Sequence, residues 1–92
     1  MNVTVRYLAQ AREAAGRASE EIELDGPTTL HDLIVRLARQ HGSAFAKMAL
    51  DGAGGPHPSL LVVIGDEQVR VGEARALAAG DTITLMTPIS GG

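Results

Sequence analysis

The chain contains no cysteine, which excludes a disulfide framework, a thiolate nucleophile and thiolate ligation of a metal. Long hydrophobic runs are also missing. The longest aliphatic stretch, residues 60–64, is far too short to cross a bilayer, and the start of the chain shows no signal-peptide pattern. We therefore expect no membrane partner and a cytoplasmic protein.

An excess of positive charge is lacking as well. The formal net charge is −3, the isoelectric point is about 5.5, and the basic residues are scattered from Arg6 to Arg75. Nucleic-acid binding domains concentrate their basic residues, so no nucleic-acid partner is expected. The composition, 45% hydrophobic and 21% charged, is that of a folded protein, and 92 residues favour one domain over residues 1–92.

The first third of the chain predicts two strands joined by a short helix. Residues 2–8 alternate between apolar and polar side chains, which indicates a half-buried strand. Residues 9–15 are rich in helix-forming side chains, and Gly16 is placed to end the helix. Residues 20–24 alternate again before a turn, so a second strand is expected to pair with the first.

The middle of the chain carries the clearest helix pattern. Thr28 or Thr29 can cap its N-terminus and Gly42 can end it. Five apolar residues recur at helical spacing between these limits: Leu30, Leu33, Ile34, Leu37 and Ala38. Another helical turn is expected over residues 43–50, followed by a loop rich in glycine and proline over 51–58.

Three more strands are predicted in the second half of the chain. The continuous apolar run at residues 60–64 is typical of a strand covered on both faces, residues 67–71 form a short strand, and residues 82–87 alternate. One long helix buries its apolar stripe best against one sheet face. The predicted fold class is therefore an α+β roll, with a mixed sheet of about four to five strands packed on one main helix.

Familiar enzymatic motifs are missing from this sequence. There is no P-loop and no pair of histidines at the i, i+4 spacing of a zinc site, so neither a cofactor-binding site nor a metal site is expected. The acidic cluster Glu20, Glu21 and Glu23 could be considered as a general acid/base pair. Glu21 and Glu23 fall on the polar face of a strand, however, so a solvated strand face is the favoured interpretation.

The C-terminus is the exception. Pro88 holds the chain extended after the last strand, and Ile89, Ser90, Gly91 and Gly92 follow, which predicts a flexible tail over residues 88–92. A terminus without side chains can enter a narrow channel and bring its carboxylate close to reactive atoms of another protein. A frayed glycine end is the plain alternative.

Leu8 and Met86 break the polar faces of the first and last strands near this tail. If those two strands lie parallel and adjacent, the two side chains form an exposed apolar patch at the root of the tail. Such patches often mark partner surfaces, although single surface hydrophobes are also common.

Several segments together resemble the MoaD/ThiS family of ubiquitin-like sulfur carriers, and among these the small subunit of molybdopterin synthase. The similar segments are Tyr7-Leu-Ala-Gln-Ala-Arg-Glu-Ala-Ala-Gly16, the central helix, Ala79-Gly-Asp-Thr-Ile83 and Thr87-Pro-Ile-Ser-Gly-Gly92. They occur in the family's order across essentially the whole chain. The resemblance implies a β-grasp fold with an extended C-terminal Gly-Gly tail.

The resemblance also implies a function. A ubiquitin-activating-type adenylyltransferase would adenylate Gly92 with ATP and Mg, and a sulfur donor protein would convert the adenylate to a thiocarboxylate. In molybdopterin synthase the sulfur then passes to a pterin precursor inside the large subunit, which supplies the catalytic side chains. Gly91 and Gly92 match the family's functional end. Leu8 and Met86 match positions where the family tends to place apolar residues that face the partner. Partner contact is also expected of Pro88, Ile89 and Ser90.

Three alternatives to the molybdopterin synthase subunit remain open. Related carriers deliver sulfur to thiamine, cysteine or tRNA thiolation, and some are conjugated to lysines as protein modifiers. A third possibility is a non-catalytic interaction module that uses its sheet face and has an inert tail.

Overall fold

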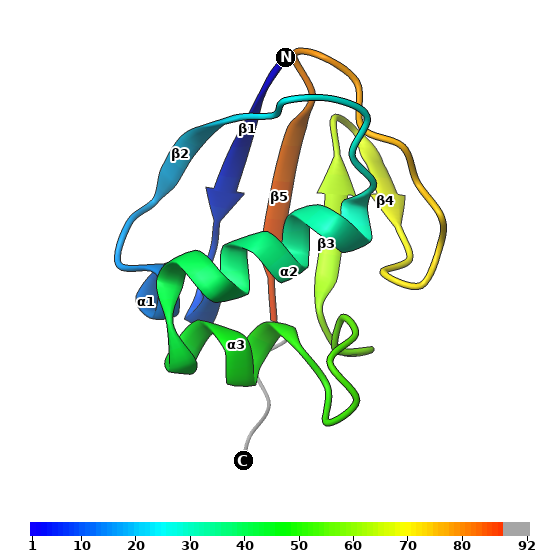
Figure 1. Ribbon diagram of the computed structural model, residues 1–92. Coiled ribbons are helices and arrows are strands. Elements are labelled where there is room, and N and C mark those ends of the chain that lie inside the picture. Colours follow the sequence, from blue (N-terminus) through cyan, green and yellow to red (C-terminus); the bar gives the residue numbers. More distant parts are fainter. Residues whose placement is uncertain (88–92) are drawn as a thin grey trace.

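The computed structural model describes residues 1–87, in which a five-stranded mixed sheet is crossed on one face by one long helix (Figure 1). The strands are β1 (Asn2–Tyr7), β2 (Ser19–Glu23), β3 (Leu61–Ile64), β4 (Glu67–Val69) and β5 (Thr82–Met86). The helices are α1 (Gln10–Ala15), α2 (Leu30–His41) and α3 (Ser43–Ala49). The predicted α+β class, with a mixed sheet on one main helix, is confirmed.

The strand order across the sheet is β2-β1-β5-β3-β4. β1 and β5 are parallel neighbours at its centre, whereas β2, β3 and β4 pair antiparallel with their neighbours. The first and last strands of the chain therefore lie side by side and run the same way. Among residues 1–87, no helix is long and apolar enough to cross a membrane.

α2 forms as its sequence predicts. The Thr29 side chain accepts a hydrogen bond of 3.2 Å from the Asp32 amide, which caps the first turn, and Gly42 ends the helix with a φ of 90° that favours glycine. The apolar stripe of α2 is at most 3% exposed along its length: Leu30, Leu33, Ile34, Leu37 and Ala38. It packs on the inward side chains of the sheet, among them Val5, Val62 and Ile83.

Two expectations need correction. Residues 43–50 hold more than one helical turn, because α3 is a seven-residue helix that buries Phe45 and Ala49. In β3, Val62 and Ile64 are buried but Leu61 and Val63 are only half-buried, so the strand is not fully covered on both faces. The apolar composition of β3 conceals its alternation, because the residues of both faces are aliphatic.

Candidate functional site

Thr87 is the last described residue before the predicted tail. It is 8% exposed, and its hydroxyl donates a 3.2 Å hydrogen bond to Oε1 of Gln10, the first residue of α1. This contact fixes the point at which the chain leaves the sheet. The predicted tail residues Pro88, Ile89, Ser90, Gly91 and Gly92 lie outside the described part of the chain.

Leu8 and Met86 lie beside each other at this point. β1 and β5 pair in parallel as far as Tyr7 with Leu85, and the Leu8 amide donates to the Leu85 carbonyl at 3.0 Å. One residue further on, Leu8 and Met86 are therefore neighbours. Leu8 is 39% exposed and Met86 is half-buried. The condition set for this patch in the sequence, that the first and last strands lie parallel and adjacent, is met.

β3 extends this apolar surface. Leu61 pairs with Met86 and Val63 pairs with Thr84, and both β3 side chains lie on the half-exposed outer face of the sheet. We call the four residues Leu8, Leu61, Val63 and Met86 the apolar patch. Sequence reasoning missed the β3 residues because it placed that strand in the interior. The sheet register needed to pair them with Met86 could not be read from one strand alone.

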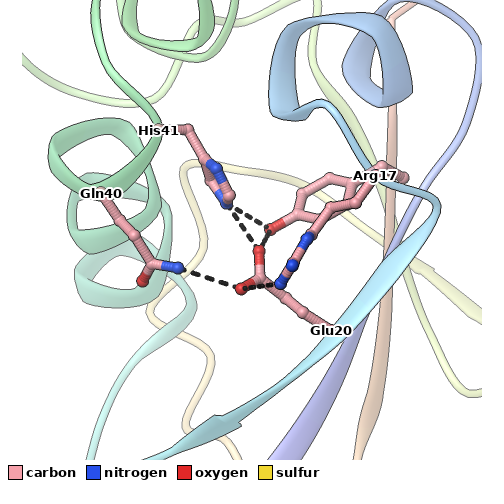
Figure 2. A network of polar contacts seen from close by, with 5 residues as sticks. Arg17, Glu20, Gln40 and His41 are labelled. Carbon is pink, nitrogen blue, oxygen red and sulfur yellow. Dashed lines mark hydrogen bonds and ion pairs between the residues drawn. The ribbon is translucent and has the colours of Figure 1, made fainter.

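A second group of side chains gathers around Glu20 (Figure 2). We call its five members the Glu20 cluster: Tyr7, Arg17, Glu20, Gln40 and His41. The Tyr7 hydroxyl donates to Oε2 of Glu20 at 2.6 Å, and Nε2 of His41 lies 2.6 Å from the same oxygen. Gln40 and Arg17 donate to Oε1 at 3.0 and 3.4 Å. Both carboxylate oxygens are thereby satisfied.

The Glu20 cluster corrects the interpretation of the acidic residues. The side chain of Glu20 is only 6% exposed, whereas Glu21 and Glu23 are exposed as expected. Glu20 shares the inward face of β2 with Ile22, because alternate residues of a strand point the same way. The alternation itself was the signal that could have separated Glu20 from its two acidic neighbours.

Electrostatics favour an ionised Glu20. Burial raises the pKa of Glu20, but hydrogen bonds from Tyr7 and His41 outweigh it and hold the pKa below its usual value of 4.5. Burial, and next the hydrogen bond to Glu20, raise the pKa of Tyr7 above its usual 10.0. A carboxylate only accepts hydrogen bonds, so Nε2 of His41 must carry a proton when it binds Glu20.

Aromatic packing supports the same cluster. The rings of Tyr7, His41 and Phe45 meet with centroid separations of 5.3 to 5.8 Å, and Tyr7 meets both others edge to face. Such pairs add to the stabilisation that burial gives. β1, α2 and α3 are thus joined at one end of the molecule.

The other two histidines lie elsewhere. His31 is exposed on α2, and Nδ1 of His57 accepts a hydrogen bond from the Ser59 amide at 3.1 Å in the loop before β3. Within residues 1–87, no three side chains of the metal-binding types His, Cys, Asp and Glu come together in a site.

Known proteins share this architecture. A structure of SAMP1 from Haloferax volcanii superimposes with a TM-score of 0.84 and 28% identity, covering 100% of both chains. Over 93 residues the chain is 30% identical to small archaeal modifier protein 3 of Haloferax volcanii, and over 92 residues it is 27% identical to the molybdopterin synthase sulfur carrier subunit of Chlamydomonas reinhardtii. Both matches cover 100% of each chain.

These likenesses define a class of protein: the small ubiquitin-like proteins of β-grasp fold that act as sulfur carriers or modifiers. Such proteins work with partner enzymes and are not themselves catalysts. The model of the ThiS family matches residues 5–92, and the chain belongs to this family.

Proposed function

We propose that this protein is a sulfur carrier whose Gly92 carboxylate is adenylated and then converted to a thiocarboxylate. The observation that carries the proposal is the family match, which extends to Gly92 and so includes both terminal glycines. An apolar patch lies beside the last described residue before them, which supports docking of a partner at that end.

The chemistry follows from the poor reactivity of a carboxylate. A carboxylate oxygen of Gly92 attacks the α-phosphate of ATP, which releases pyrophosphate and leaves an acyl-adenylate. A sulfur donor protein then releases sulfide, whose sulfur attacks the carbonyl carbon; AMP leaves, and loss of the proton gives the thiocarboxylate. ATP and Mg are held by the activating adenylyltransferase in this proposal, and this chain binds no cofactor.

In this proposal the chain's own residues bind the partner enzyme and bring the C-terminal carboxylate to its active site. Leu8 and Met86 contact the partner, Pro88, Ile89 and Ser90 lead into its channel, and Gly91 and Gly92 fit where side chains would not. The same residues make these contacts first with the adenylyltransferase and later with the enzyme that accepts the sulfur.

The acceptor that we propose is the molybdopterin precursor, with this chain as the cytoplasmic small subunit of molybdopterin synthase. The 27% identity to a molybdopterin synthase sulfur carrier subunit over the full length of both chains supports this choice. The large subunit then supplies the catalytic side chains, and the two subunits form a hetero-oligomer.

Intact mass spectrometry tests the carrier function. After incubation with an adenylyltransferase, ATP and a sulfur donor, the mass should rise by about 16 Da as oxygen is replaced by sulfur at the terminus. Removing Gly92, or adding one residue after it, should abolish this gain and leave the fold intact. Full activity in either variant would overturn the proposal.

A protein modifier is the second candidate, favoured by the 30% identity to small archaeal modifier protein 3. It predicts isopeptide-linked adducts between Gly92 and lysines of other proteins in a lysate. For a non-catalytic interaction module, by contrast, partner binding and function would persist after removal of residues 90–92.

A further inference from the structure

The Glu20 cluster has no direct part in chemistry at the C-terminal carboxylate, yet it joins the elements at the end of the molecule from which the tail departs. It connects the end of β1 through Tyr7, the start of β2 through Glu20, and the last turn of α2 through His41 (Figure 2). A buried carboxylate holds its largely buried partners, here Tyr7 and His41, in one arrangement, because leaving a buried polar group unpaired is costly.

Tyr7 links the Glu20 cluster to the apolar patch. It is the last residue of β1, is 1% exposed and pairs with Leu85 of β5. The next residues along the two strands are Leu8 and Met86, whose side chains lie on the opposite face of the sheet. A shift of Tyr7 would therefore move Leu8 through the backbone, and Met86 through the pairing of Tyr7 with Leu85.

The backbone immediately after Leu8 is strained. Ala9 has a φ of 52° and a ψ of −127°, and it is the one non-glycine residue with a positive φ in the described part of the chain. Such a conformation costs on the order of 1–3 kcal/mol and persists only where the surroundings determine it. Ala9 also lines the same surface depression as Arg17 of the Glu20 cluster.

Two anchors hold Ala9 in this conformation. On one side, Tyr7 is held by Glu20 and His41. On the other side, the amides of Arg12 and Glu13 donate to the Ala9 carbonyl at 3.1 and 3.3 Å.

Helix α1, which provides the second anchor, also contacts the last described residue before the tail. α1 begins at Gln10, directly after Ala9, and the Gln10 side chain binds Thr87. The turn at Ala9 thus determines where Leu8 points and where Thr87 is held.

We propose that Tyr7, Glu20 and His41 are positioning residues for activation of the C-terminus. By fixing the end of β1 they keep the strained turn at Ala9, and with it the apolar patch and Thr87, in the arrangement on which the activating enzyme docks. The role of these residues in activation rests on the proposed function. The coupling between Glu20 and the patch is a property of the chain alone.

The coupling depends on the charge of Glu20. The groups that face this carboxylate are Tyr7 from β1, Arg17 from the segment before β2, and Gln40 and His41 from α2. At neutral pH Glu20 is ionised and accepts from all four. Protonation below pH 4.5 removes the negative charge that attracts them, so the end of β1 should relax in acid.

NMR spectroscopy of the full chain tests the coupling without any enzyme. From pH 7 down to pH 3, the signals of Leu8, Ala9 and Met86 in the folded protein should shift with the same midpoint as the Glu20 carboxyl. Glu20→Gln should remove this titration, and the matched control Glu21→Gln on the exposed face of β2 should retain it. If the signals of Leu8, Ala9 and Met86 do not titrate with the midpoint of Glu20, the inference is overturned.

Kinetics at neutral pH test the consequence. In thiocarboxylate formation, Glu20→Gln and Tyr7→Phe should raise the KM for this chain about fivefold and leave kcat within about twofold, as expected when docking alone is weakened. His41→Ala should act likewise, whereas His41→Gln, which can still donate to Glu20, should restore most of the lost affinity.

The failures of the two proposals are distinguishable. If the wild-type chain gains no sulfur, the proposed function fails while the NMR titration still decides the positioning role. If the wild-type chain gains sulfur but the variants keep the wild-type KM, or His41→Gln and His41→Ala behave alike, the positioning role is wrong and the carrier function stands.

Discussion

Glu20 is a carboxylate with a 6% exposed side chain and four hydrogen-bonding neighbours. Its pKa is lower in the folded chain than in the unfolded one, so its contribution to stability is present above pH 4.5 and is lost as the pH falls through the folded pKa. Acid should therefore weaken the packing around Glu20, at the end of the molecule where β1 and β5 finish.

Glu20→Gln tests this dependence of stability on pH, because it removes the charge of the side chain and keeps its shape. At pH 7 the variant should be less stable than the wild type by about 2 kcal/mol, the usual contribution of hydrogen bonds to a charged group. The gap should close as the pH falls below 4.5. Urea unfolding at several pH values measures it, with Glu21→Gln expected within about 0.5 kcal/mol of wild type. A gap that is independent of pH would contradict the assignment.

The strain at Ala9 predicts a gain of stability by substitution. Ala9→Gly should raise the free energy of unfolding by about 1 kcal/mol, because glycine adopts a φ of 52° without a Cβ clash. Ala18, an exposed residue without a positive φ, provides the matched control. Ala18→Gly should lower stability slightly, since it adds only freedom to the unfolded chain. Equal effects of the two substitutions in thermal or urea unfolding would show that Ala9 carries no strain.

Among the elements, those with a single strong pattern were predictable and those defined by pairing were not. The stripe of α2 and its Thr29 cap follow from spacing and side-chain chemistry, and both are found in the structure. α3 was underestimated because only Phe45 and Ala49 point inward, too few for a clear period. The half-exposure of Leu61 depends on which helices cover which face of the sheet, and no property of the β3 residues alone decides that.

β3 offers a test with adjacent residues on opposite faces. Leu61→Ser should change the free energy of unfolding by less than about 1 kcal/mol, while Val62→Ser should cost about 3 kcal/mol because it places a hydroxyl in the core and removes buried methyl groups. Under the proposed function, Leu61→Ser should also raise the KM for activation. Equal destabilisation by both changes would place Leu61 in the interior after all.

For the molecule as a whole, amine chemistry is limited to very few positions. Lys47 is the one lysine in the sequence, and it lies exposed on α3. The other amine, at Met1, is partly buried and donates to the Leu24 carbonyl at 2.8 Å. Conjugation between copies of this chain therefore has one accessible side-chain acceptor.

The modifier alternative consequently makes a narrow prediction. Any adduct joining two copies should map by tandem mass spectrometry to Gly92 and Lys47, and Lys47→Arg should abolish it. Thiocarboxylate formation should be unchanged in the same variant, because Lys47 lies outside the apolar patch. If copies of Lys47→Arg still form an adduct, the amine at Met1 is the acceptor.

The parallel pairing of β1 and β5 has a practical consequence. β1 and β5 run the same way, so Met1, which precedes β1, lies at the opposite end of these strands from Leu8 and Thr87, which follow them. The N label in Figure 1 marks the Met1 end. A fluorophore, an affinity handle or a second protein fused before Met1 would then face away from the surface that we propose for docking. The chain can be anchored by its N-terminus to a sensor chip, and its reactive end presented to candidate enzymes one after another.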